Sequence, residues 1–277
     1  MKFFKTKLTC TLFLTGAFLF WQNNGLMLTK ITYTKNVPPG FHNYKILQVS
    51  DLQNKAFGQN QEQLLSKIKN AAPDIIVITG DLIDRNRTNL DTAMIFIDEA
   101  VNIAPVYYVT GNHEHQSGQF YELEKRLINA NVTVLENGKS VIHRNGNTLE
   151  IIGLADKRVN PYLKKALSTL KSDENERFSI LLSHRPELFE TYAENDINLA
   201  FTGHAHGGQI RLPFIGGIFA PNQGFFPDYT SGIYEKENTA MVVSRGLGNS
   251  TFPFRIFNRP ELVLVTLDSQ DKVDENI

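Results

Sequence analysis

Polar residues suited to metal binding follow each of five apolar segments in the sequence. The segments are YKILQVS (44–50), DIIVITG (74–80), VYYVTG (106–111), FSILLS (178–183) and INLAFTG (197–203). The polar residues that follow them are Asp51, Asp81, Asn112 with His113, His184, and His204 with His206. Gln53 stands two residues after Asp51. The repetition of this pattern five times predicts that these side chains work together.

Two carboxylates, a side-chain amide and three imidazoles have few uses when they are buried together. Without a cation the carboxylates would be unpaired and costly to bury. Oxygen and imidazole ligands suit divalent metals such as Mn, Fe or Zn. With Gln53 counted, the candidate ligands exceed one tetrahedral site, whereas two metals sharing one carboxylate would use them all. Such a pair, about 3.5–4 Å apart, favours the in-line displacement of phosphoester hydrolysis.

The apolar segments have the length and continuous apolarity of strands that are buried on both faces. Between the first four lie three segments with helical spacing of apolar residues, at 60–73, 88–105 and 117–131. Asn89 and Ser117 are expected to cap the second and third of these helices. This alternation predicts an α/β fold, in which the carboxyl ends of neighbouring strands open on one crevice.

After residue 130 the predicted strands become shorter and lie closer together. The segments VTVLEN, KSVIHR and NTLEIIGL indicate an antiparallel portion, with a hairpin turn at 145–147. The count fits two mixed sheets packed face to face and flanked by helices. We expect this domain to span 44–268, preceded by a linker at 29–43 and followed by a polar tail at 269–277.

The N-terminus has the pattern of a signal peptide or an uncleaved signal anchor over residues 1–28. Three lysines precede an apolar run from Leu8 to Trp21, and no small-residue cleavage site follows it. Lysines on a short N-terminal flank favour a cytoplasmic flank and an exported body. We therefore expect a cell-membrane protein with one N-terminal anchor and an extracytoplasmic domain, or one exported after cleavage. The alternative is an apolar helix packed on the domain of a cytoplasmic enzyme.

Charge and cysteine content exclude some classes of protein. The formal net charge is −1, so the basic surplus typical of nucleic-acid binders is absent and no polymeric nucleic acid is expected as a partner. The one cysteine, Cys10, lies in the N-terminal apolar run. The body therefore has neither a disulfide nor a thiolate metal site.

The ordered motifs D-x-Q, GDLIDR, GNHE, H and GHAH resemble those of the calcineurin-like metallophosphoesterase superfamily. The later segments GHAHGGQIRLPFIGGIFAPNQG and SRGLGNSTFPFRIFNRPEL are similar to its membrane-associated bacterial branch. The resemblance implies phosphodiesterase activity, and some relatives cleave lipid-linked nucleotide pyrophosphates. A phosphoester substrate, lipid-linked substrates included, is therefore the expected partner.

The resemblance also implies a role for each candidate residue. Asp51, Gln53, Asp81 and His206 would hold the first of two divalent metals. Asp81 would bridge to the second metal, which Asn112, His184 and His204 would complete. A bridging hydroxide would attack phosphorus, and His113 would protonate or stabilise the leaving oxygen. Arg85 is a weaker candidate for phosphate contact, since a salt bridge at a helix start explains it equally well.

Position 53 departs from the superfamily pattern, which has histidine there. A glutamine oxygen still binds a hard cation but is a poorer ligand for softer ones, so the first site would shift toward Mn²⁺ or Mg²⁺. Alternatively, Gln53 hydrogen-bonds a water on the metal. The rival function is a catalytically silent, phosphate-binding envelope protein that has lost one metal through Gln53.

Overall fold

The computed structural model describes residues 2–156, 162–171, 177–249 and 252–270. Its core is built from two six-stranded sheets. Sheet I has the strand order β1 (Met27–Tyr33), β16 (Glu261–Leu267), β2 (Tyr44–Val49), β3 (Ile75–Thr79), β4 (Val106–Val109), β5 (Thr133–Val134). Sheet II has the order β14 (Gly232–Lys236), β15 (Thr239–Val243), β9 (Leu199–Thr202), β8 (Phe178–Leu182), β7 (Asn147–Gly153), β6 (Gly138–Arg144).

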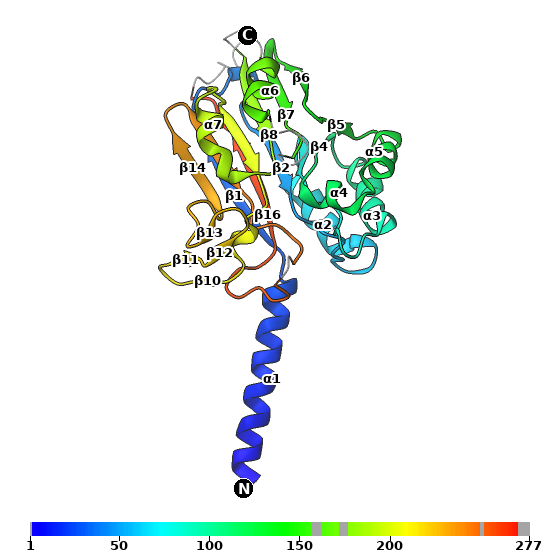
Figure 1. Cartoon of the computed structure of the whole chain (residues 1–277), viewed down its shortest axis with the longest axis vertical. Helices are drawn as coiled ribbons and strands as arrows, with labels where there is room; N and C mark the ends of the chain where they lie inside the picture. The colour runs from blue at the N-terminus through cyan, green and yellow to red at the C-terminus, as the bar shows by residue number, and fades with distance from the viewer. Residues whose placement is uncertain (1, 157–161, 172–176, 250–251, 271–277) are drawn as a thin grey trace.

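Helices cover the outer faces of both sheets (Figure 1). Helices α2 (Glu62–Ala71), α3 (Leu90–Ala100) and α5 (Phe120–Asn129) lie on sheet I, and α6 (Leu163–Leu170) and α7 (Phe189–Ala193) lie on sheet II. The short helix α4 (Asn112–Ser117) follows β4. The predicted α/β fold with two mixed sheets face to face is confirmed.

The alternation of side chains along each strand explains the layers. In β2, Leu47 and Val49 pack against the helices of sheet I, while Ile46 points between the sheets. In β8, Ile180 and Leu182 face the layer between the sheets and Leu181 faces the helices of sheet II. Because successive side chains point to opposite faces, strands buried on both faces need the continuous apolar runs seen in the sequence.

Strand directions bring the carboxyl ends of the five strands that precede the candidate ligands to one end of the molecule. These strands are β2, β3, β4, β8 and β9. Strands β2, β3, β4 and β5 are parallel, as are β7, β8, β9 and β15. The antiparallel portion is the hairpin of β6 and β7, with Asn145 and Gly146 at positive φ in its turn. Strand β16 is antiparallel to β2, and β14 is antiparallel to β15.

Three local predictions can be compared directly with the structure. Residues 27–33, which run from the end of the predicted signal segment (1–28) into the predicted linker (29–43), form β1, which pairs in parallel with β16 at the edge of sheet I. Ser117 ends α4 rather than capping α5; its Oγ accepts a hydrogen bond from the N–H of Gln119 at 3.0 Å. Asn89 does cap α3, accepting from the N–H of Thr92 at 3.1 Å.

The N-terminal helix α1 (Lys2–Asn24) projects from the body (Figure 1). Among the helices of the described residues, none is both long and apolar enough to cross a membrane. Most of the predicted tail, from 271 onward, lies outside the described residues.

Four two-residue strands lie in the loop that follows β9: β10 (Arg211–Leu212), β11 (Gly216–Gly217), β12 (Phe219–Ala220) and β13 (Gly224–Phe225).

Candidate dinuclear metal site

The candidate ligands converge at the carboxyl ends of strands from both sheets. Sheet I contributes Asp51 after β2, Asp81 after β3 and Asn112 after β4, while sheet II contributes His184 after β8 and the pair His204 and His206 after β9. All are buried. Two groups form, one of Asp51, Asp81 and His206 and the other of Asp81, His184 and His204. In each group the donor atoms lie within 4.8 Å of one another.

Asp81 belongs to both groups. Its Oδ2 lies 3.3 Å from Nε2 of His184. On the other side, Nε2 of His206 lies 3.3 Å from Oδ1 of Asp51. Nδ1 of His204 lies 3.1 Å from Nε2 of His184, so the two rings turn donor atoms toward the same point. This is the arrangement in which a carboxylate can be shared by two cations.

Two buried side-chain oxygens support a cation in this site. Oδ1 of Asn112 and Oε1 of Gln53 accept no hydrogen bond from any residue that the structure describes. A buried polar atom without a partner is costly, and hard divalent cations bind such amide oxygens. The donor set of carboxylates, amides and imidazoles is therefore a fit for divalent metal ions.

The electrostatics of the site show the same need for positive charge. Burial raises the pKa of Asp51 to about 6. For Asp81 burial acts in the same sense but the adjacent His184 outweighs it, so its pKa lies below the usual range. Burial opposes protonation of His184, yet the Asp81 carboxylate raises its pKa to about 10. A divalent cation supplies the compensation that a protonated His184 gives here.

The backbone turns sharply where the ligands leave their strands. Asp51 and Asp81 both have φ of +52°, a left-handed conformation that is uncommon outside glycine. The glycines beside them allow close approach. A Cβ on Gly111 would lie 2.3 Å from Oδ1 of Asp81, and one on Gly203 would lie 1.9 Å from Oγ of Ser50. Larger residues at these two positions would displace the ligands.

Glu114 holds the turn around Asp81. Its two buried carboxylate oxygens accept backbone hydrogen bonds from Asp81 at 2.9 Å, Leu82 at 2.7 Å, Ile83 at 3.2 Å and Gly111 at 2.7 Å. Burial raises the pKa of Glu114 to about 7, and the nearby Asp81 carboxylate acts in the same sense, while the backbone N–H donors favour the ionised form. This side chain therefore fixes the segments after β3 and β4 relative to each other. Its place in GNHE, next to His113, is the sequence signal for this role.

His113 lies beside the two groups with a defined orientation. Its Nδ1 accepts a hydrogen bond from the backbone N–H of Arg85 at 3.1 Å, so Nδ1 carries no proton. The proton of the neutral ring is then on Nε2, which lies 3.8 Å from Oδ2 of Asp81. Burial lowers the pKa of His113 below its ordinary value, which favours the neutral ring. The ring therefore presents a hydrogen-bond donor to the site.

Gln53 and Arg85 occupy different surroundings. The amide of Gln53 lies in the site, with Nε2 3.4 Å from Oδ2 of Asp81 and 3.3 Å from Nε2 of His206. Turning the amide over would exchange its nitrogen and oxygen. The exposed guanidinium of Arg85 instead hydrogen-bonds Oε1 of Gln116, so phosphate contact by Arg85 stays a prediction.

Sequence reasoning missed a buried network behind His204. Arg185 forms a two-pronged ion pair with Asp156, with Nε–Oδ2 at 2.7 Å and Nη2–Oδ1 at 3.0 Å. Its Nη1 donates to Oδ1 of Asn222 at 2.8 Å, and the same oxygen lies 3.0 Å from Nε2 of His204. Nη1 of Arg185 also lies 2.9 Å from Nε2 of His204, so Arg185 and Asn222 together fix the orientation of the ring that turns Nδ1 toward His184. The signal that could have found it is an arginine directly after a candidate ligand.

Comparison with known proteins agrees with this geometry. Residues 44–208 match the family described as calcineurin-like phosphoesterase. The chain is 36% identical over 241 residues to the uncharacterized metallophosphoesterase YkuE of Bacillus subtilis (strain 168), covering 84% of this chain and 82% of that protein. It is 27% identical over 234 residues to phosphodiesterase YaeI of Escherichia coli (strain K12), covering 81% and 82%. The chain belongs to the calcineurin-like phosphoesterase family, and metal-dependent phosphoester hydrolysis is its general activity.

Proposed function

We propose that the protein is a phosphodiesterase or pyrophosphatase that uses two divalent cations. The observation that carries this proposal is the position of Asp81 in both donor groups. Asp51, Gln53, Asp81 and His206 would hold one cation, and Asp81, Asn112, His184 and His204 the other. When bound, the cations would neutralise phosphoryl oxygens and activate a water molecule.

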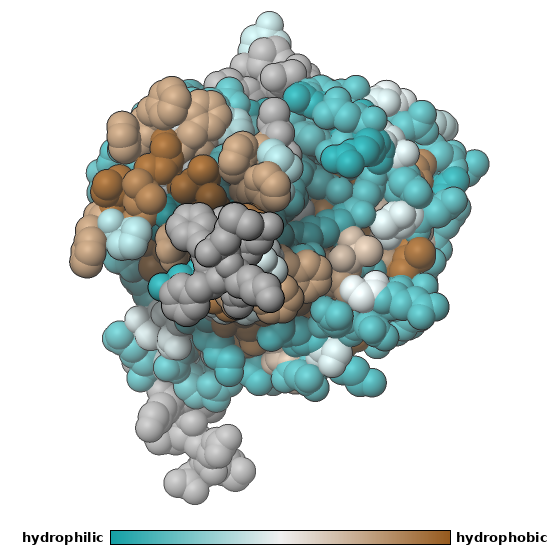
Figure 2. Space-filling view, turned by 90° about the horizontal axis from the view of Figure 1, so that it is seen from below, coloured by the Kyte–Doolittle hydropathy of each residue, from teal (hydrophilic) through white to brown (hydrophobic). Residues whose placement is uncertain are grey.

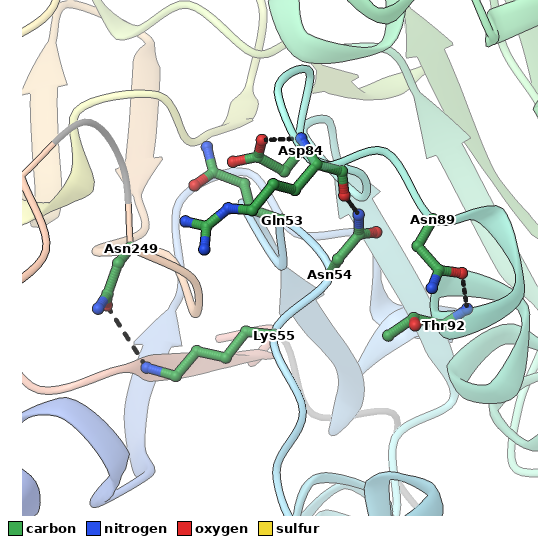
Figure 3. A pocket seen from close by; sticks show the side chains of 8 residues that line it. Gln53, Asn54, Lys55, Asp84, Asn89, Thr92 and Asn249 are labelled. Carbon is green, nitrogen blue, oxygen red and sulfur yellow. Dashed lines mark hydrogen bonds between the residues drawn. The ribbon is translucent and has the colours of Figure 1, made fainter.

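A pocket beside the first donor group supports a diester over a monoester. It has a volume of about 380 Å³ and borders Gln53. Lys55 and Arg87 are among the residues that line it. Nζ of Lys55 donates to Oδ1 of Asn249 at 3.5 Å, a hydrogen bond that is drawn in Figure 3. A diester or pyrophosphate carries a second substituent on phosphorus that needs such a space, whereas a monoester does not. The similarity to phosphodiesterase YaeI points in the same direction.

His113 would act on the leaving oxygen as a hydrogen-bond donor. The backbone N–H of Arg85 occupies Nδ1, so the ring offers its Nε2–H to the site. A donor aimed at charge that develops in the transition state lowers the barrier without itself titrating. Stabilisation of the leaving oxygen is therefore the role that we assign to His113, in preference to full proton transfer.

We further propose a location for the protein and a class of natural substrate. The lysines and apolar run of the N-terminus support export and attachment to the cell membrane, with the domain outside the cytoplasm. A lipid-linked phosphoester fits such a location. Protease treatment of intact cells tests it: the domain should be cleaved from outside, and full protection would refute the location.

Substrate preference tests the proposed chemistry. With Mn²⁺ present, we expect kcat/KM for bis-p-nitrophenyl phosphate to exceed that for p-nitrophenyl phosphate by about tenfold or more, which corresponds to about 1.4 kcal/mol of transition-state stabilisation. A panel of lipid pyrophosphates extends the comparison. A preference for the monoester would overturn the diester assignment. No metal-dependent hydrolysis of any of these would favour the silent phosphate-binding protein.

A further inference from the structure

Apolar side chains that no part of the described chain covers gather on two loops at one end of the molecule. The loop after β9 exposes Phe214 fully, Phe225 by 73% and Phe226 by 68%; the loop between β15 and β16 exposes further phenylalanines. We call this the aromatic surface, defined by Phe214, Ile215, Phe225, Phe226, Phe254 and Phe257. Contiguous exposed apolar patches on soluble domains mark interaction sites.

The two loops form one surface because they are joined by backbone and side-chain hydrogen bonds. Ile210 and Ile256 form a β-bridge, and the N–H of Arg211 donates to the carbonyl of Ile256 at 3.0 Å. Asn258 Nδ2 donates to the carbonyl of His206 at 2.7 Å. The exposed phenylalanines are therefore carried on a connected scaffold.

The aromatic surface is continuous with α1. The ring of Phe18 in α1 packs edge-on against Phe257, with centroids 5.6 Å apart. The end of the helix is tied to the same loop, since Oδ1 of Asn23 accepts from the N–H of Arg255 at 3.0 Å. Figure 1 shows α1 leaving the body beside β10–β13, and Figure 2 shows hydrophobic residues gathered over one side of this end. The apolar helix and the aromatic surface thus face the same way.

The three segments that form this end of the molecule contain basic residues but no acidic ones. Residues 1–24, 206–227 and 245–259 contain no aspartate or glutamate. They contain lysines and arginines, among them Lys7, Arg211 and Arg259. Aromatic and basic residues without acids are the pattern that binds an anionic lipid surface.

We infer that the aromatic surface seats on an anionic phospholipid bilayer, with its phenylalanines at the boundary between headgroups and acyl chains and α1 entering the same interface. The aromatic surface would contact the bilayer in addition to α1, so attachment would not depend on the N-terminal segment alone. The loop that carries Phe214 includes His206 and also Asn222, which contacts His204. Seating it would place the candidate site at the lipid surface, a consequence for substrate access that rests on the proposed function.

A tryptophan introduced into the surface tests the inference in the full-length chain. Trp21 is the one tryptophan of the sequence, so Trp21→Phe gives a silent background. In that background, Phe214→Trp should show a blue-shifted emission with vesicles containing phosphatidylglycerol, quenched by brominated acyl chains. The matched control is Tyr121→Trp, at a side chain 80% exposed on α5, whose emission should stay unchanged. If the Phe214→Trp variant sediments with vesicles but its emission does not respond, α1 alone binds and the inference fails.

Partition measurements give a second, independent test. Phe225→Ser with Phe226→Ser should lower the vesicle partition coefficient by about tenfold or more, since burying one phenylalanine contributes about that factor. Tyr121→Ser should leave it unchanged, and circular dichroism of both variants checks that they fold. An unchanged coefficient for the double variant overturns the inference. So does a lipid-free dimer of the Phe214→Trp variant with emission that is already blue-shifted, because a second copy would then cover the surface.

Discussion

Oδ2 of Asp81 lies 3.3 Å from Nε2 of His184, although the two residues come from different sheets. Asp81 follows β3 of sheet I, and His184 follows β8 of sheet II. The distance between them is therefore set by the apolar layer that packs the sheets together. Because that layer is close-packed, the candidate metal site is positioned by the core rather than by flexible loops.

Replacing Gln53 by histidine should strengthen the first cation site. Imidazole is the better ligand for Zn²⁺ than a side-chain amide, so Gln53→His should raise the affinity for Zn²⁺ at one of two sites by about tenfold or more. Titration calorimetry of the metal-free protein measures this change. Gln53→Ala is the control and should weaken the same site. Equal Zn²⁺ affinity in all three proteins would remove Gln53 from the ligand set.

Removing the imidazole of His113 should slow catalysis without loss of metal. His113→Ala takes away the Nε2–H donor, so kcat should fall by about 10²–10³-fold, while metal content stays that of the wild type. A substrate with a better leaving group should be affected less, because its leaving oxygen needs less stabilisation. An equal loss for good and poor leaving groups would contradict the role assigned to His113.

Glu114→Gln should destabilise the fold. The amide would turn an N–H₂ group toward backbone N–H donors that now face a carboxylate, leaving buried donors unpaired. We expect a loss of about 3 kcal/mol in the free energy of unfolding measured in urea. Glu99→Gln, on the exposed side of α3, is the control and should change stability little. A variant as stable as the wild type would show that the backbone bonds of Glu114 contribute little.

Lys55 should give the protein a pH-dependent stability on the alkaline side. Burial, together with Arg255, lowers the pKa of Lys55 to about 7 from its ordinary value of 10.5. Between these values the unfolded chain binds the proton and the folded chain does not, so the free energy of unfolding rises with pH. This contribution is constant below about pH 7 and reaches its full gain near pH 10.5.

The Lys55→Met variant isolates that contribution. Urea unfolding of both proteins from about pH 7 to about pH 10 should show a stability that rises more steeply with pH in the wild type, by at most about 1.4 kcal/mol per pH unit. The stability curves of wild type and variant are compared pairwise, so other titrating groups cancel. Parallel curves would contradict a lowered pKa at Lys55.

The sequence predicted the parts of the fold that depend on burial of both strand faces. The runs before Asp51, Asp81 and His184 are continuously apolar because each strand packs on helices outside and on the other sheet inside. Strand β1 was missed because its side chains are mostly only partly buried at a sheet edge. A strand at the edge of a sheet buries fewer side chains and therefore needs fewer apolar residues. Its sequence pattern resembles that of a linker.

The sequence likewise identifies some residues of the candidate site and not others. Ligands such as His204 are recognisable by residue type and by their position after a strand. The position of Arg185 directly after His184 is visible in the sequence, but its contact with Asn222 is not, because it joins residues 37 positions apart, with Asn222 in the turn between β12 and β13. The orientation of His113 also depends on a backbone N–H, which the sequence does not encode as a residue type.

The number of metal ions per chain decides whether the protein has a dinuclear centre. The purified, metal-free protein is loaded with Mn²⁺, freed of unbound ions and analysed by mass spectrometry of the metal per chain, beside Asp81→Asn. We expect about two ions per chain in the wild type and a clear loss in the variant, because Asp81 would serve both sites. One ion or none in the wild type, or unchanged content in Asp81→Asn, would contradict a dinuclear centre built around Asp81.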